Sequence, residues 1–190
     1  MKSKKYYSSQ YEATPQLHGK KGRWLKYNYK YKGDYFKYDV SDQKLLKIRI
    51  VFLAVTLLCA ALFVGAGLLN TDGTRRMWVS LPYISMFLPL AVMAYDCVKQ
   101  FFAQREMTEK ERDSVVEELL KSTFGLVITS GLTIVGTIVF LLTEQVQKIA
   151  NELLFLGMIF LVFIVSFVMW KYQRSLPVII VKQNTHKEDQ

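Results

Sequence analysis

The residues that could support chemistry are few and scattered along the chain. The two histidines, His18 and His186, lie near the two ends of the sequence, and the two cysteines, Cys59 and Cys97, lie within or beside apolar runs. Two cysteines cannot build a disulfide framework or the usual zinc site. HExxH, Walker A and GxSxG motifs are absent from the sequence. We therefore predict no enzyme activity, no catalytic residue, no cofactor and no metal site.

Asp96 is the best single candidate for a functional acid. It stands between Tyr95 and Cys97 at the end of an apolar run. Ion-coupled transporters usually keep an ionisable residue in the middle of a membrane span, and this chain has none there. Arg49 and Glu152 likewise stand at span ends, where a charge costs little. We favour an interfacial cap as the role of Asp96, with a functional acid as the alternative.

Four long apolar runs decide the fold class. Each has enough length to cross a hydrocarbon layer of about 30 Å as a helix. A very hydrophobic soluble bundle is the alternative, but four such runs would leave it no polar surface. We predict an all-α membrane protein whose four transmembrane helices cover residues 46–70, 77–103, 122–144 and 149–173.

The cationic residues predict the orientation. Of the 25 Lys and Arg residues, thirteen precede residue 50, five follow the second run and four follow the last run. The two remaining connections carry three between them. Cationic residues collect on the cytoplasmic side, so both termini are expected in the cytoplasm of a multi-pass protein of the cell membrane.

Small residues and prolines suggest how these helices pack. Small residues allow close helix approach in lipid, and proline bends a helix. Two prolines, Pro82 and Pro89, are expected to kink the second span. The predicted helix-packing positions, in the first and third spans, are Ala61, Gly65, Gly125, Thr129, Thr133 and Gly136.

The cationic stretch before the first span has a strand pattern. Tyr27, Tyr29 and Tyr31 alternate with polar residues, and Gly33-Asp34 is typical of a type II′ hairpin turn. This predicts a cytoplasmic β-hairpin of residues 24–32 and 35–40, in which Tyr31 faces Phe36. The β-branched residues 178–181 are a candidate third strand.

This tail also offers a binding surface. Next to a membrane span, its cationic and aromatic side chains favour the anionic inner leaflet of the lipid bilayer, with a protein partner second and nucleic acid not expected. The candidate contacts are Lys26, Lys30, Lys32, Lys37, Tyr27, Tyr29, Tyr31, Phe36 and Tyr38.

The chain therefore divides into three regions. Residues 1–45 form the cationic aromatic tail, residues 46–175 the membrane bundle, and residues 176–190 a cytoplasmic strand and tail. Residues 108–121, inside the bundle region, begin with a capping box and are predicted to form an amphipathic helix leading into span three. A solvated helical extension of that span is the alternative.

With no catalytic set and little chain outside the membrane, we expect an accessory or regulatory subunit of a larger membrane assembly. Its partner is another protein or a second copy. The alternative is a small oligomeric transporter or channel, whose path would follow the threonines of span three.

Overall fold

The computed structural model describes residues 8, 11–18, 24–146 and 148–181, and of residues 12–18 and 24–30 it describes the backbone alone. These residues fall into two compact units, each described by itself below. The helical unit comprises residues 40–103 and 115–176. The strand unit comprises Met1–Asp39, Gln104–Ser114 and Pro177–Gln190.

Four helical spans of the described chain are long and apolar enough to cross a membrane. They are α2 (Asp42–Leu68), α3 (Met77–Ser85) with α4 (Phe87–Phe102), α6 (Glu118–Thr143) and α7 (Ile149–Ser175). This confirms the prediction of four such helices, and it is compatible with a multi-pass membrane protein. The 27 residues of α2 extend about 40 Å, more than the hydrocarbon core needs.

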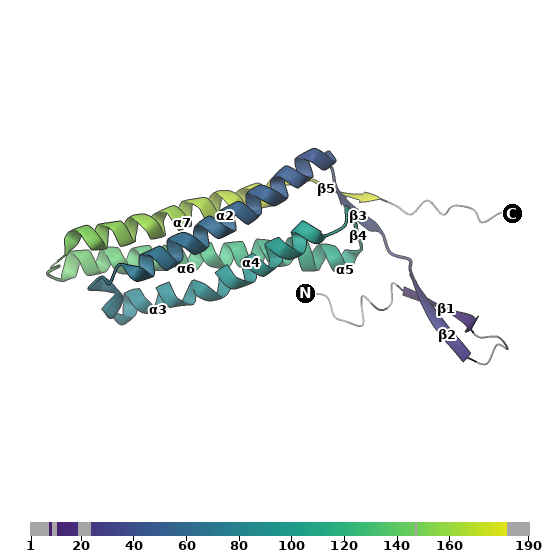
Figure 1. The fold of residues 1–190 in the computed structure, drawn as a ribbon, viewed down its shortest axis with the longest axis horizontal. Coiled ribbons are helices and arrows are strands. Elements are labelled where there is room, and N and C mark those ends of the chain that lie inside the picture. The colour runs from purple at the N-terminus through teal and green to yellow at the C-terminus, as the bar shows by residue number, and fades with distance from the viewer. Residues whose placement is uncertain (1–7, 9–10, 19–23, 147, 182–190) are drawn as a thin grey trace. The chain divides into compact units, whose positions relative to one another are not determined.

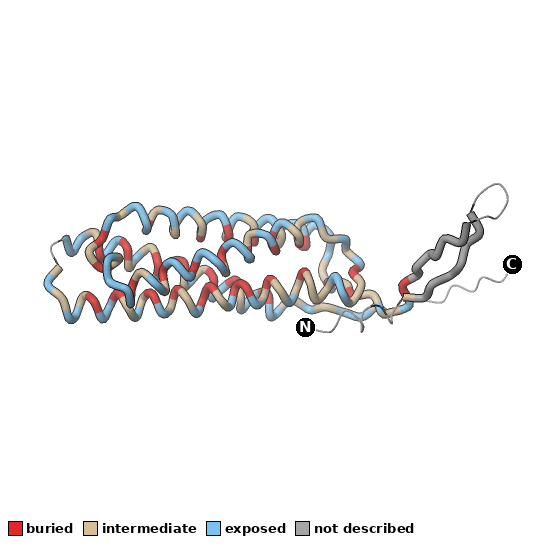
Figure 2. Tube along the Cα trace, turned by 90° about the horizontal axis from the view of Figure 1, so that it is seen from below, coloured by how far each residue is buried: buried red, intermediate tan, exposed pale blue. Residues whose placement is uncertain are grey.

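The spans pack as an antiparallel bundle (Figure 1). Helix α7 lies between α2 and α6, while α2 also contacts α4, and α6 contacts both α3 and α4. Buried residues lie on the inner faces of the helices and exposed residues on the outside (Figure 2). Many of the exposed residues are large and apolar. In α2 the buried residues recur at steps of three, four or seven, which is the spacing of one helix face. They are Leu45, Phe52, Thr56, Cys59 and Ala66.

The second span is interrupted at Met86, between α3 and α4. Pro89 has no N–H for the carbonyl of Ser85, four residues earlier, so the regular ladder breaks there. Pro82 leaves the Trp78 carbonyl without its helical donor in the same way. Pro89 thus accounts for the division of this span into two helices, whereas Pro82 stands inside α3 without interrupting it.

Glycines of α6 lie where that helix meets α3 and α4. A Cβ atom on Gly136 would stand 2.6 Å from the Trp78 carbonyl oxygen, the same oxygen that Pro82 leaves without its helical donor. A Cβ atom on Gly125 would lie 3.3 Å from the Cβ of Pro89. Side chains at these positions would push the helices apart, so glycine allows the close approach.

The other predicted packing residues differ in how far they are buried. Thr133 is fully buried and Thr129 is half-buried. A Cβ atom on Gly65 would lie 3.7 Å from the Met158 side chain, which is an ordinary contact distance. Ala61 is exposed, so its assignment to a packing face within this bundle is wrong. It stands two residues beyond the buried Cys59, which turns it by about 200° to the outer face.

The strand unit contains two separate sheets. The first pairs β1 (Tyr11–His18) with β2 (Trp24–Tyr31), antiparallel, with Tyr11 opposite Tyr31. The second has the order β4–β3–β5, with β3 (Tyr35–Tyr38) in the centre. Its edge strands are β4 (Glu106–Met107) and β5 (Val178–Val181), both antiparallel to β3. The expected strand at 178–181 is therefore present.

The predicted hairpin of residues 24–32 and 35–40 is wrong. Strand β2 pairs with β1, while β4 and β5 occupy both edges of β3. Gly33 does not have the positive φ that a type II′ turn requires at its first central residue. It is needed because the Tyr31 ring folds back over it, and an added Cβ there would overlap the Tyr31 hydroxyl. Tyr31 therefore does not face Phe36.

The connection before α6 begins with the expected capping box. The Thr108 hydroxyl accepts the Glu111 N–H at 3.3 Å, and the Glu111 carboxylate accepts the Thr108 N–H at 2.9 Å. Helix α5 (Glu109–Arg112) leads through a π-helical turn, η2 (Asp113–Glu117), into α6. The expected helix of residues 108–121 is thus helical, with a π-turn inside it.

Candidate functional site

Two carboxylates are buried in the helical unit, one towards each end of the bundle. Asp96 of α4 and Glu152 of α7 are both 1% exposed. We call the end where α2 and α6 begin the Asp96 end, and the opposite end the Glu152 end. A buried carboxylate is costly unless it is hydrogen-bonded, so the partners of each one indicate what it can do.

Asp96 lies inside the bundle against α6. The Ser122 hydroxyl lies 3.1 Å from Asp96 Oδ2, within donating distance, and it also lies 3.1 Å from the Leu119 carbonyl oxygen. Nearby on the same two helices, Lys99 and Glu118 form an ion pair of 3.5 Å. Asp96 therefore does not cap a helix at the surface, which was the role we favoured from the sequence.

Further polar side chains lie at the Asp96 end. Arg49 of α2 donates to the Phe101 carbonyl at 3.3 Å, and Gln100, one turn after Asp96, is 3% exposed. Gln173 of α7 is buried, and neither atom of its amide has a hydrogen-bond partner among the described residues. Each of the four spans thus contributes a polar residue here. We call Arg49, Asp96, Gln100, Ser122 and Gln173 the polar layer.

The sequence indicated only part of this layer. Asp96 stands out in the sequence as an acid next to a span, whereas Gln100, Ser122 and Gln173 carry no charge and lie near ordinary helix ends. The spacing of Asp96 and Gln100 by four residues was the one signal that both could share a helix face. Which residues of the other helices join them depends on the order of the helices in the bundle.

Glu152 joins the start of α7 to the connection between α2 and α3. Its Oε1 accepts the Gly73 N–H at 2.9 Å, at the start of the 3₁₀ turn η1 (Gly73–Arg75). Oε2 has no hydrogen-bond partner among the described residues. A Cβ atom on Gly73 would lie 2.8 Å from this oxygen, so a side chain there would require the carboxylate to move.

A polar pocket of about 410 Å³ opens at the Glu152 end. Within it Arg76 and Glu144 form an ion pair at 2.6 Å. The pocket is lined by Asp72, Arg75, Arg76, Phe140, Glu144 and Gln145. Two acids balance two bases in this lining, so the pocket has no marked preference for ligand charge.

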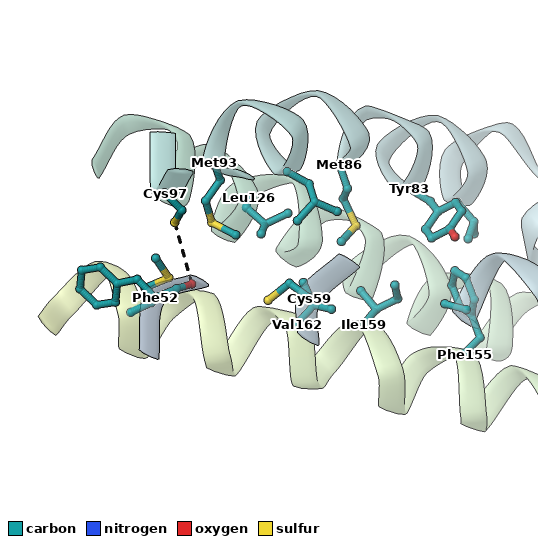
Figure 3. Close-up of a cluster of buried hydrophobic side chains, with 14 of the residues drawn as sticks. Phe52, Cys59, Tyr83, Met86, Met93, Cys97, Leu126, Phe155, Ile159 and Val162 are labelled. Carbon is teal, nitrogen blue, oxygen red and sulfur yellow. Dashed lines mark hydrogen bonds between the residues drawn. The ribbon is translucent and has the colours of Figure 1, made fainter. Parts of the chain in front are cut away.

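The middle of the bundle is apolar (Figure 3). Side chains from the different spans meet there, among them Cys59, Met86, Leu126 and Ile159. The Thr137 hydroxyl donates to the carbonyl of Thr133, four residues earlier, and other hydroxyls of α6 do the same. A hydroxyl that donates to a backbone carbonyl of its own helix needs no water molecule as a hydrogen-bond partner. In the described spans, no ionisable carboxylate or cation lies between the two buried acids.

The tail residues proposed as binding contacts separate into three groups. Tyr31, Phe36 and Tyr38 are buried, so assigning them to a binding surface is wrong. The Arg112 guanidinium lies 4.3 Å from the centre of the Phe36 ring. Lys32 is exposed and Lys37 is half-buried. The side chains of Lys26, Tyr27, Tyr29 and Lys30 lie outside the described residues.

Tyr31 shows how the strand unit holds itself together. Its hydroxyl donates to the Asp34 carbonyl and accepts the Glu109 N–H, both at 3.1 Å. Burial raises the pKa of Tyr31 above its ordinary value of 10.0, and the hydrogen bond from Glu109 opposes this shift. The phenol thus ties the segment after β2 to the start of α5.

Among the residues that the structure describes, no three His, Cys, Asp or Glu side chains lie close enough to hold a metal ion. Three sites stand out among the described residues: the polar layer, the β5 edge of the β4–β3–β5 sheet, and the hydrogen bond from the Gly73 N–H to Glu152, which we call the Glu152 clamp. Comparisons with protein-family models, curated protein sequences and solved structures return no match to this chain.

Proposed function

We propose that this chain is a non-enzymatic membrane protein that serves as an accessory or regulatory subunit of a larger membrane assembly. The observation that carries the proposal is the open edge of β5. Among the described strands it pairs with β3 alone, and its side chains Ile179 and Ile180 are 42% and 57% exposed. An apolar edge strand with unpaired backbone groups is suited to receiving a strand from another protein.

The proposed orientation places both termini in the cytoplasm. The Asp96 end of the bundle then faces the anionic inner leaflet, and the segments of the strand unit lie on the same side of the membrane. This follows from the large excess of Lys and Arg in the connections at that end. Lys32 and Lys37 contact lipid headgroups or the partner in this arrangement, at about 1 kcal/mol for each well-placed lysine.

The alternative, a small oligomeric transporter or channel, needs a polar path through the bundle. Helix α6 was the expected lining, but Thr133 and Thr137 are fully buried and donate to carbonyls of their own helix. The apolar side chains of Figure 3 fill the space between the spans. This packing favours the accessory subunit over the transporter.

The test is purification of the tagged chain from native membranes in mild detergent, followed by mass spectrometry. We expect a partner at a fixed ratio with the wild type, and its loss from Ile180→Lys. Lysine at an edge strand disfavours the addition of another strand. Glu106→Gln, which changes the charge by the same amount at the opposite edge of the sheet, is expected to retain the partner.

Two results would contradict the proposal. One is an isolated monomer with no partner at a fixed ratio. The other is a partner that both variants retain or both lose, because the β5 edge would then not be the docking site.

A further inference from the structure

The outer surface of the bundle has an apolar groove between α2 and α7, with a volume of about 260 Å³. Val51 and Val55 of α2 form one wall, and Ile164, Val168 and Tyr172 of α7 form the other. At its floor Phe52 meets Tyr172 edge-on, with ring centres 6.1 Å apart. Apart from the Tyr172 hydroxyl, the side chains that line the groove carry no polar group.

Three lysines lie on the groove face at the Asp96 end. Lys47 and Lys44 precede Val51 by four and seven residues, and Lys171 follows Ile164 by seven. In an α-helix such steps keep residues on one face, so these cations continue the two walls of the groove. All three are exposed, and none forms an ion pair with an acid among the described residues.

We propose that this groove binds one anionic phospholipid. One acyl chain lies in the groove between α2 and α7, and the phosphate is held by Lys44, Lys47 and Lys171. The Tyr172 hydroxyl stands at the boundary between the two parts, where an amphipathic ring meets both. This site goes beyond the proposed docking role, since its ligand is a lipid and it uses neither sheet.

Charge complementarity decides the kind of lipid. In a bilayer the acyl chains of all phospholipids are as apolar as the groove walls, so burial of a chain does not select one lipid over another. Three cations without anionic partners select for a negative headgroup. Each well-placed lysine contributes about a factor of five to this selection, and three give roughly 100-fold.

The groove supplies shape rather than charge. Its volume lies just under the range of about 300–1,000 Å³ that is usual for pockets of drug-sized ligands. A single flexible acyl chain can follow such a narrow space along the two helices. Filling the groove with a larger side chain is therefore expected to displace the lipid without changing the charge of the protein.

The test uses the purified full chain in detergent micelles doped with equal amounts of phosphatidylglycerol and phosphatidylcholine. Native mass spectrometry measures the lipid that remains bound. We expect the wild type to retain one phosphatidylglycerol, with a preference of roughly 100-fold over phosphatidylcholine. The triple variant Lys44→Gln, Lys47→Gln, Lys171→Gln is expected to lose this preference.

Two matched variants separate the site from bulk charge. Lys110→Gln, Lys121→Gln, Lys148→Gln removes the same charge elsewhere and is expected to bind as the wild type does. Val168→Trp keeps all the lysines but fills the groove, and is expected to lose the bound lipid. Retained thermal unfolding temperature shows that each variant is folded.

The proposal is overturned if the wild type binds both lipids equally, or if the control triple variant loses the preference as well. It is also overturned if Val168→Trp retains the lipid. Both micelle lipids reach every face of the protein, so these results do not depend on the orientation in the cell or on a protein partner.

Discussion

Glu152 shows how a single charged side chain can join two spans. One oxygen accepts the Gly73 N–H, while the backbone of η1 approaches the other so closely that a β-carbon on Gly73 would displace the carboxylate. The carboxylate is 1% exposed and therefore gains little from water. Its hydrogen bond to the backbone is the stabilising contact that offsets part of its desolvation.

Replacing Glu152 by alanine should destabilise the bundle by about 1–3 kcal/mol, because a buried N–H loses its acceptor. Glu152→Gln keeps an oxygen at the same place and should cost less. Glu144→Gln is the control, since its exposed ion pair with Arg76 is worth about 0–1 kcal/mol. Denaturant unfolding in detergent measures all three. Equal losses for Glu152→Ala and Glu144→Gln would contradict the clamp.

Because Tyr31 is buried, we expect the stability of the folded protein to fall at high pH. Burial raises its pKa in the folded protein above the ordinary value of 10.0. Below pH 10 the phenol is protonated in both the folded and unfolded states, and its contribution is complete. As the pH rises above 10 the unfolded chain ionises first, so this contribution falls until the folded pKa is passed.

The measurement is a titration of tyrosine ionisation by ultraviolet absorbance, for the wild type and for Tyr31→Phe. The difference between the two curves belongs to Tyr31, and its midpoint is expected above 10. Below pH 10, Tyr31→Phe should be less stable by about 1–3 kcal/mol, from two lost hydrogen bonds. A difference curve with its midpoint at or under 10 would refute the burial argument.

Helices α3 and α6 approach each other closely because Pro82 of α3 and Gly136 of α6 act on the same contact. Pro82 frees the Trp78 carbonyl, and Gly136 leaves room for it against α6. Neither residue alone indicates this arrangement in the sequence. The two lie 54 positions apart, and only the packing of α3 against α6 brings them together.

Gly136→Ala should therefore destabilise the bundle by about 1–3 kcal/mol, since its new methyl group meets backbone that cannot rotate away. Gly157→Ala is the control, because a Cβ at Gly157 in α7 meets nothing within 4 Å. There the better helix propensity of alanine should stabilise the protein by about 0.5–1 kcal/mol. Unfolding in detergent measures the stability of both variants. If Gly136→Ala is as stable as the wild type, the close contact between α3 and α6 is ruled out.

The sequence predicts elements well where the signal is local. Hydropathy located the spans to within a few residues; the second, for example, was expected at 77–103 and is found at 77–102. The capping box of Thr108 and Glu111 could also be recognised in the sequence, because its pattern covers only four consecutive residues. Both features depend only on side chains that are near in sequence.

Pairing of strands is a different problem, and there the prediction failed. The Gly33-Asp34 turn signal favoured β2 against β3, but β3 pairs with segments about 70 and 140 residues further along the chain. Strand β1 lies in a polar segment for which no strand was predicted, and its Pro15 is tolerated because β1 is an edge strand. The polar layer was incomplete for the same reason, since it depends on which helices are neighbours.

At the scale of the whole molecule, the cationic charge is concentrated before residue 50. Residues 1–49 carry all of the formal net charge of +9, and the rest of the chain sums to zero. A positive charge spread over the whole surface would favour binding to nucleic acid or solubility in water. Positive charge next to the first span instead influences how that span is oriented in the membrane. The proposed orientation follows from this distribution.

A green fluorescent protein fused after residue 190 tests the orientation, because it matures to a fluorescent form in the cytoplasm. Alkaline phosphatase inserted after Gln145, which becomes active only outside, tests the opposite face. We expect both reporters to be active. If both reporters are inactive, and both become active when their positions are exchanged, the orientation is the opposite of the one proposed.

The central place of β3 has a consequence for the timing of folding. Its partner β5 is synthesised about 140 residues later, after all four spans. At 5–20 residues per second this delay is roughly 7–30 s. Both edges of β3 are open until β4 is synthesised, and the edge that pairs with β5 stays open for the rest of that time. A nascent chain that stops before α7 is finished keeps this edge open. Closure of this sheet therefore requires that synthesis has passed the last span.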